Sequence, residues 1–135
     1  MQRHRTLIPV LSLLLVITAS ALGARRDAFW GTWQITISPG PDAVRVKEFK
    51  DKLTFKGDQL VSDFARTQGI ESTQYTEDTR GGIAATFEAE GTGKKTKAKI
   101  KWSGTSTGRD ITGEMTWTKP DGSVVEYTFK GEKVN

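Results

Sequence analysis

Hydrophobic and polar residues alternate along most of the chain after residue 28. Apolar side chains recur at every second position there, which is the spacing of a strand that buries one face. The clearest runs are residues 33–37, 53–55, 83–90, 95–102, 111–117 and 125–129. The pattern therefore predicts an all-β domain in which each strand presents an apolar face to a common core.

Residues that favour tight turns separate these runs at short intervals. Gly57-Asp58, Gly91-Thr92-Gly93, Ser106-Thr107-Gly108 and Pro120-Asp121-Gly122 supply the glycine, proline and aspartate that turns require. Strands joined by short turns pair with their neighbours in chain order, and closing such a sheet removes its two exposed edges. We therefore expect an antiparallel up-and-down β-barrel of about eight strands.

The stretch from Leu60 to Asp78 allows two interpretations. Ser62 to Gln68, followed by Gly69, has the form of a short capped helix with glycine just beyond its end. Residues 60–65 also fit a strand that runs into a loop. We expect the strand with an irregular tail, and the helix is the alternative.

The N-terminal segment has the three parts of a secretion signal. Arg3 and Arg5 precede an apolar tract over residues 7–17, and the small residues Ala19-Ser20-Ala21 follow it. This order predicts a cleavable signal peptide over residues 1–21.

Cleavage after Ala21 leaves a single domain over residues 22–135, and Gly23 is the second choice of cleavage site. The mature protein is then secreted or periplasmic and has no membrane span. The alternative is an uncleaved anchor over Leu7–Ala24, whose 18 residues are the shortest length that spans a bilayer.

Export changes the inventory of charge and of reactive side chains. Arg3 and Arg5 leave with the signal peptide, so the net charge falls from +4 to +2 and gives no reason to expect a nucleic-acid partner. The only histidine, His4, leaves as well, and the chain has no cysteine. Histidine-dependent and thiol-dependent catalysis and imidazole or thiolate metal sites are thereby excluded. We expect no catalytic residue, no metal and no cofactor, and a protein that is not an enzyme.

A row of lysines invites interpretation as a stripe that binds polyanions. It consists of Lys94, Lys95, Lys97, Lys99 and Lys101. In a barrel of neighbouring strands the preceding strand supplies Glu88 and Glu90 and the following strand supplies Asp110 and Glu114. Acidic rows on both sides cancel much of the local field, so we expect a solvated outer face.

The apolar face of the predicted strands offers a candidate ligand site. Its residues are Phe55, Phe87, Trp102, Met115, Trp117 and Tyr127. Small inward-facing residues leave room among them, Tyr127 adds a polar group and Met115 adapts its shape to a ligand. A pocket for a small apolar or amphipathic ligand and a fully packed core both fit this composition.

The start of the domain resembles that of a known group of barrels. Phe29-Trp30-Gly31-Thr32-Trp33 contains the Gly-x-Trp that opens the first strand in lipocalins and related calycin barrels. Overall the chain is most similar to small exported bacterial lipocalin-like proteins. The resemblance implies that Trp33 closes one end of the barrel and that a basic residue near the last strand, Lys133 or Lys130, packs across it. It also implies binding of a small ligand inside the barrel.

Some secreted inhibitors of bacterial proteases resemble this chain in size, export and barrel shape. They insert their N-terminal residues into the enzyme, and here that segment is Leu22–Phe29. The alternative function is therefore a protein-binding module, with an envelope protein or a protease as its partner.

Overall fold

A computed structural model describes residues 28–41, 46–80 and 84–135. The predicted signal peptide lies outside these residues. Within them, eight strands form a closed antiparallel barrel in chain order, as the alternation predicts. The strands are β1 (Gly31–Pro39), β2 (Phe49–Lys56), β3 (Gln59–Ser62), β4 (Thr73–Asp78), β5 (Ala85–Thr92), β6 (Lys99–Ser106), β7 (Asp110–Thr118) and β8 (Val124–Lys133).

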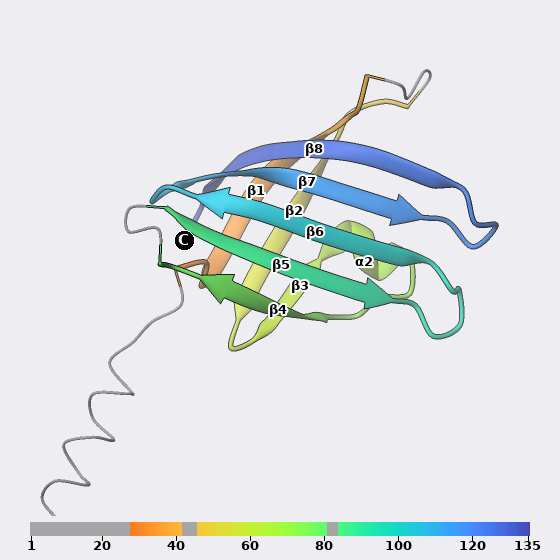
Figure 1. The fold of residues 1–135 in the computed structure, drawn as a ribbon, viewed down its shortest axis with the longest axis horizontal. Helices are drawn as coiled ribbons and strands as arrows, with labels where there is room; N and C mark the ends of the chain where they lie inside the picture. The colour runs from red at the N-terminus through yellow and green to blue at the C-terminus, as the bar shows by residue number, and fades with distance from the viewer. Residues whose placement is uncertain (1–27, 42–45, 81–83) are drawn as a thin grey trace, which may run out of the picture.

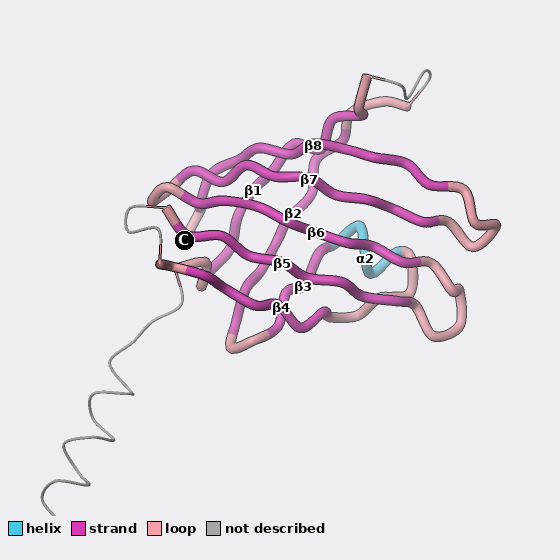
Figure 2. The backbone as a smooth tube through the Cα atoms, in the orientation of Figure 1, coloured by secondary structure: helices cyan, strands magenta, loops and turns pink. Residues whose placement is uncertain are grey.

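The barrel closes because β1 pairs with both β2 and β8. In Figure 1, β1 to β3 run at a steep angle to β4 to β8. The two groups of strands are joined by the pairing of β3 with β4 and of β8 with β1. The start of β1 and the C-terminus lie toward one end of the barrel, whereas α2 (Asp63–Thr67) lies toward the other. Figure 2 shows α2 in cyan, and it is the one helix among the residues that the structure describes.

The lysine-rich strand is shorter than expected. Its predicted range was residues 95–102, but β6 begins at Lys99, and residues 93–98 form the turn before it. The Gly93 N–H donates to the Ala98 carbonyl at 2.8 Å, and Lys97 takes a φ of +66°. Alternation alone does not separate a strand from a turn whose polar residues happen to keep the same spacing.

The lysine row is correspondingly divided. Lys99 and Lys101 lie on the outer face of β6, and Lys99 forms an ion pair with Glu90 at 3.3 Å. Of the two acids expected on β7, Glu114 lies opposite Ser103, two positions from the partner of Lys101, which is Thr116, and Asp110 has no partner on β6. The other lysines of the row belong to the β5–β6 turn.

The expected strand with an irregular tail is wrong for residues 63–67, which form α2, and the helical alternative holds there. The Ser62 hydroxyl accepts a hydrogen bond from the Ala65 N–H at 3.0 Å and caps the helix. Gly69 follows the helix with a φ of +84°, a conformation that favours glycine. Strand β3 therefore ends at Ser62.

No helix in the described part of the chain is long and apolar enough to cross a membrane.

Candidate ligand site at the α2 end of the barrel

One end of the barrel is sealed by its own aromatic side chains. Phe29 is fully buried, and its carbonyl accepts a hydrogen bond from the Trp33 indole N–H at 2.8 Å. Its ring packs against Phe55 and Phe87, with centroids 5.4 and 5.0 Å away. Lys133 lies over Trp33, with its Nζ 5.7 Å from the centre of the ring. The two residues predicted for closure, Trp33 and Lys133, therefore meet at this end.

The burial of Phe29 bears on the inhibitor alternative. That interpretation uses Leu22–Phe29 as an arm that enters a partner enzyme, but Phe29 belongs to the core. Residues 22–27 lie outside the described part of the chain.

The middle of the barrel is filled as well. Trp102 packs against Phe129 with ring centres 5.7 Å apart, and Met115 is fully buried opposite Trp102 in the β6–β7 pairing. Gly104 and Gly113 make room for these rings, since a Cβ on Gly113 would lie 2.5 Å from Phe129 Cζ. Side chains occupy the space that a ligand would need at this level.

The six residues predicted to bind a ligand are thus divided between different levels. Phe55 and Phe87 belong to the sealed end, and Trp102 and Met115 to the filled middle. Trp117 contacts Phe64 of α2, and Tyr127, which lies opposite Met115 on the neighbouring strand, contacts Phe49. All except Trp117 are buried.

The α2 end has a different character, because its apolar side chains are only partly buried. We call it the apolar mouth, and it consists of the partly buried Phe49, Phe64, Trp117 and Val125, which are connected by ring contacts and by the pairing of Trp117 with Val125. The Phe64 ring, from α2, stands edge-on to Trp117 at 5.1 Å and also contacts Phe49 at 5.0 Å. Phe49 in turn packs on Tyr127, and burial raises the pKa of the Tyr127 hydroxyl.

The indole nitrogen of Trp117 is unpartnered. Among the described residues, Trp117 Nε1 is the one buried side-chain nitrogen or oxygen without a hydrogen-bond partner. Lys119 Nζ lies 5.0 Å from the centre of the same ring. The mouth thus combines apolar side chains, one buried N–H donor without a partner and one nearby cation.

Asp51 is a functional candidate that the pattern of apolar residues did not reveal. It shares the inward face of β2 with Leu53 and Phe55, yet it carries a carboxyl group. Its Oδ2 accepts from the Ser62 hydroxyl at 2.6 Å, and its Oδ1 accepts from the N–H groups of Phe64 and Lys52. Burial raises the pKa of Asp51 above its ordinary value of 3.8. An acidic residue at an inward position was the available sequence signal.

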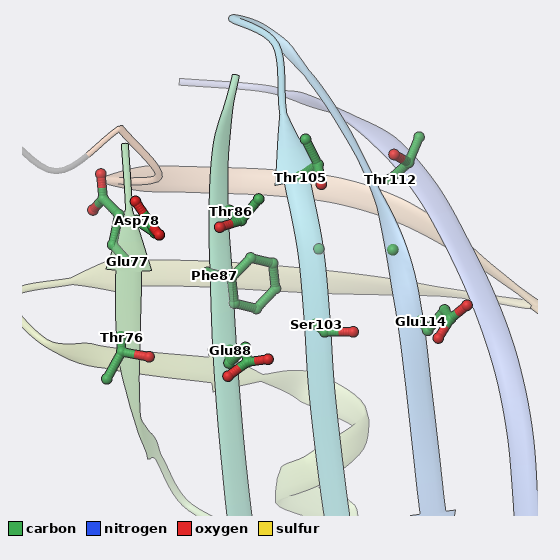
Figure 3. Close-up of a pocket in the computed structure, with 12 residues that line it drawn as sticks. Thr76, Glu77, Asp78, Thr86, Phe87, Glu88, Ser103, Thr105, Thr112 and Glu114 are labelled. Atoms are coloured by element: carbon green, nitrogen blue, oxygen red, sulfur yellow. The ribbon is translucent and has the colours of Figure 1, made fainter. Parts of the chain in front are cut away.

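A hollow of about 670 Å³ lies on the outer face of β4 to β7. Figure 3 shows Glu88, Ser103 and Glu114 in one row across it, with Thr86 and Thr105 in the next. Hydroxyl and carboxylate groups line this groove, which is open and polar. No group of three or more acidic, histidine or cysteine side chains in the described ranges is placed to hold a metal ion.

Comparison with known proteins adds no relative. No protein-family model, no curated protein and no solved structure matches this chain.

Proposed function

We propose that the protein is an exported, lipocalin-like barrel that binds a small apolar or amphipathic molecule at the apolar mouth. The observation that carries the proposal is the unpartnered N–H of Trp117 among half-buried apolar side chains. Ligand sites commonly combine apolar walls with a few polar groups that fix orientation. Here Trp117 donates a hydrogen bond to an oxygen of the ligand while Phe49, Phe64 and Val125 contact its apolar part.

The energetics favour a ligand that carries an acceptor atom. A buried N–H without a partner costs about 1–3 kcal/mol, which a ligand oxygen in hydrogen-bonding distance relieves. A carboxylate serves best, because a hydrogen bond to a charged group is worth about 1.5–3 kcal/mol and Lys119 adds a positive charge beside the ring. The preferred ligand is therefore an amphipathic molecule with one anionic or carbonyl end.

The test is a titration with cis-parinaric acid, a fluorescent molecule with a carboxylate and an apolar tail. We expect the wild type to bind it and Trp117→Phe, which keeps an aromatic ring but removes the N–H, to bind it about 10-fold or more weakly. Trp30→Phe is the matched control, because Trp30 is 47% exposed and precedes β1 at the sealed end. A wild type that does not bind the probe, or equal affinities for the two variants, would overturn the proposal.

Export is the part of the proposal that concerns residues 1–21. N-terminal sequencing of the protein from its own host is expected to begin at Leu22, and a start at Met1 contradicts export by cleavage.

A further inference from the structure

Helix α2 is fastened to the barrel at its first turn by one carboxyl group. Asp51, on β2, accepts from the Ser62 hydroxyl at 2.6 Å and from the Phe64 N–H at 3.0 Å. The Ser62 hydroxyl oxygen accepts in turn from the Ala65 N–H at 3.0 Å. Asp51 and Ser62 are thus the two side chains that cap the helix, and Asp51 also holds Ser62 in place. We call these three hydrogen bonds the Asp51 latch.

The other end of α2 is held by a different strand connection. The Thr96 hydroxyl, in the β5–β6 turn, donates to the Gln68 carbonyl at 2.7 Å. Gly93 allows this approach, because a Cβ there would lie 2.7 Å from the same oxygen. The helix thus spans from β2 to the β5–β6 turn, across the end of the barrel that carries the apolar mouth.

The side chain that α2 places over the mouth is Phe64. It contacts Trp117 and Phe49, and it is the helical residue that covers the indole of Trp117. Asp63, Arg66 and Thr67 point to solvent. A five-residue helix has little stability of its own, so the latch, the Thr96 bond and the contacts of Phe64 and Ala65 fix its position.

We propose that α2 is a gate over the apolar mouth and that the Asp51 latch controls its opening. The proposal rests on the proposed function, since it concerns access to the same site. Opening breaks the bonds of Asp51 to Ser62 and Phe64, swings Phe64 away from Trp117 and exposes the indole N–H to an entering ligand.

The closed state holds the carboxyl group of Asp51 away from water, and this burial favours opening of the latch. Opening rehydrates Asp51, which offsets part of the loss of its hydrogen bonds. The raised pKa of Asp51 is in line with this, since burial is its largest cause and the neighbouring Asp63 acts in the same direction.

The latch has a direct readout, because the amides of Phe64 and Ala65 donate to side chains of the latch. Amide hydrogen exchange measured by NMR on the full domain reports latch opening at these two positions, and exchange of the Trp117 indole N–H reports uncovering of the mouth. We expect Ser62→Ala to accelerate all three by about 10-fold. Arg66→Ala is the matched control, because Arg66 lies exposed on the same helix outside the latch, and it is expected to change them less than about 3-fold.

The second measurement is the association rate of cis-parinaric acid by stopped flow. We expect Ser62→Ala to associate faster than the wild type by about the same factor as its exchange. If Ser62→Ala does not fold, Ser62→Gly serves instead, because glycine keeps most of the capping preference without the hydroxyl.

The outcomes separate the two proposals. A wild type that does not bind the probe overturns the proposed function, whereas the exchange data still judge the gate. Unchanged exchange of Phe64 and Ala65 in Ser62→Ala overturns the latch. Faster amide exchange without faster exchange of the Trp117 indole, or without faster association of a probe that binds, overturns the gate.

Discussion

Lys133 and Trp33 lie directly opposite each other in the pairing of β1 with β8, and the lysine Nζ stands 5.7 Å from the centre of the indole ring. Gly31 makes this arrangement feasible, because a Cβ at that position would lie 2.8 Å from Lys133 Cε. The Gly-x-Trp at the start of β1 thus has a local physical reason. Glycine leaves space for the lysine stem, and tryptophan provides the surface on which the stem lies.

Substitutions of Trp33 and of Lys133 are expected to lower the free energy of unfolding by different amounts. Trp33→Ala should lower the free energy of unfolding by about 3–5 kcal/mol, because Trp33 is fully buried and a cavity would remain. Lys133→Met keeps the stem and removes the charge, so the loss should be about 0.5–2 kcal/mol. Urea denaturation measures both. Lys130→Met, on the outward face of the same strand, is the control, and an equal loss there would contradict a specific contact of Lys133 with Trp33.

Gly113 is expected to tolerate no larger residue. A Cβ on Gly113 would lie 2.2 Å from the Ser103 carbonyl oxygen and 2.5 Å from Phe129 Cζ. Gly113→Ala should therefore lower the free energy of unfolding by about 1–3 kcal/mol or more. Thr112→Ala, at the exposed neighbouring position, should change it by less than about 1 kcal/mol. Thermal unfolding that ranks these two variants in the reverse order would contradict the packing described for the middle of the barrel.

Asp51 should make stability depend on pH in the direction opposite to most carboxyl groups. Its pKa lies above 3.8 in the folded protein, so the folded state binds this proton more tightly than the unfolded chain. Lowering the pH through the folded pKa toward 3.8 therefore adds stability, and raising it removes that contribution.

The comparison needs Asp51→Asn, because other groups titrate too. The hydrogen bonds of Arg80 lower the pKa of Asp78 to about 2, and this exposed group acts in the opposite direction. The free energy of unfolding of the wild type minus that of Asp51→Asn should fall as the pH rises through the pKa of Asp51 and stay flat above it. Urea titrations over a pH series measure the difference, and a difference that rises with pH would be the wrong sign.

Replacing Lys97 by glycine is expected to stabilise the domain. Its φ of +66° is unfavourable for a residue with a Cβ, whereas glycine adopts it freely. Lys97→Gly should raise the free energy of unfolding by about 0.5–1 kcal/mol in denaturant titration. Lys95→Gly, in the same turn without a positive φ, should lower it. If both changes destabilise, the turn differs from the one described.

The parts of the fold that local pattern determines were predictable, and those that depend on context were not. Runs such as residues 33–37 and 125–129 lie in strands because alternation fixes which face is buried. At residues 95–98 the same alternation continues into a turn, since hydrogen bonds between Gly93, Lys97 and Ala98 decide the chain path. At residues 63–67 the capping side chain of Ser62 decides for helix, and its partner Asp51 lies eleven positions earlier on another strand.

The candidate site shows the same division more sharply. The sequence identified Trp117 and Tyr127 as inward aromatic residues but grouped them with Phe55 and Phe87, because strand parity carries no information about height along the barrel. Register sets that height, and register comes from pairing between strands.

By itself, then, the sequence determined the class of fold and the inward face of most strands, because these follow from spacing along a strand and from turn residues. The resemblance of residues 29–33 to the start of calycin barrels indicated Trp33 as the closing residue but left Lys133 and Lys130 open as its partner, and the pairing of β1 with β8 decided for Lys133. Only the tertiary structure decided that the middle is filled, that α2 lies across the other end and that the Trp117 N–H lacks a partner. Those properties depend on which side chains from distant strands meet at the same level. Because the interior is closely packed, the space at each level is decided by all of these side chains together, and the sequence of one strand does not contain that information.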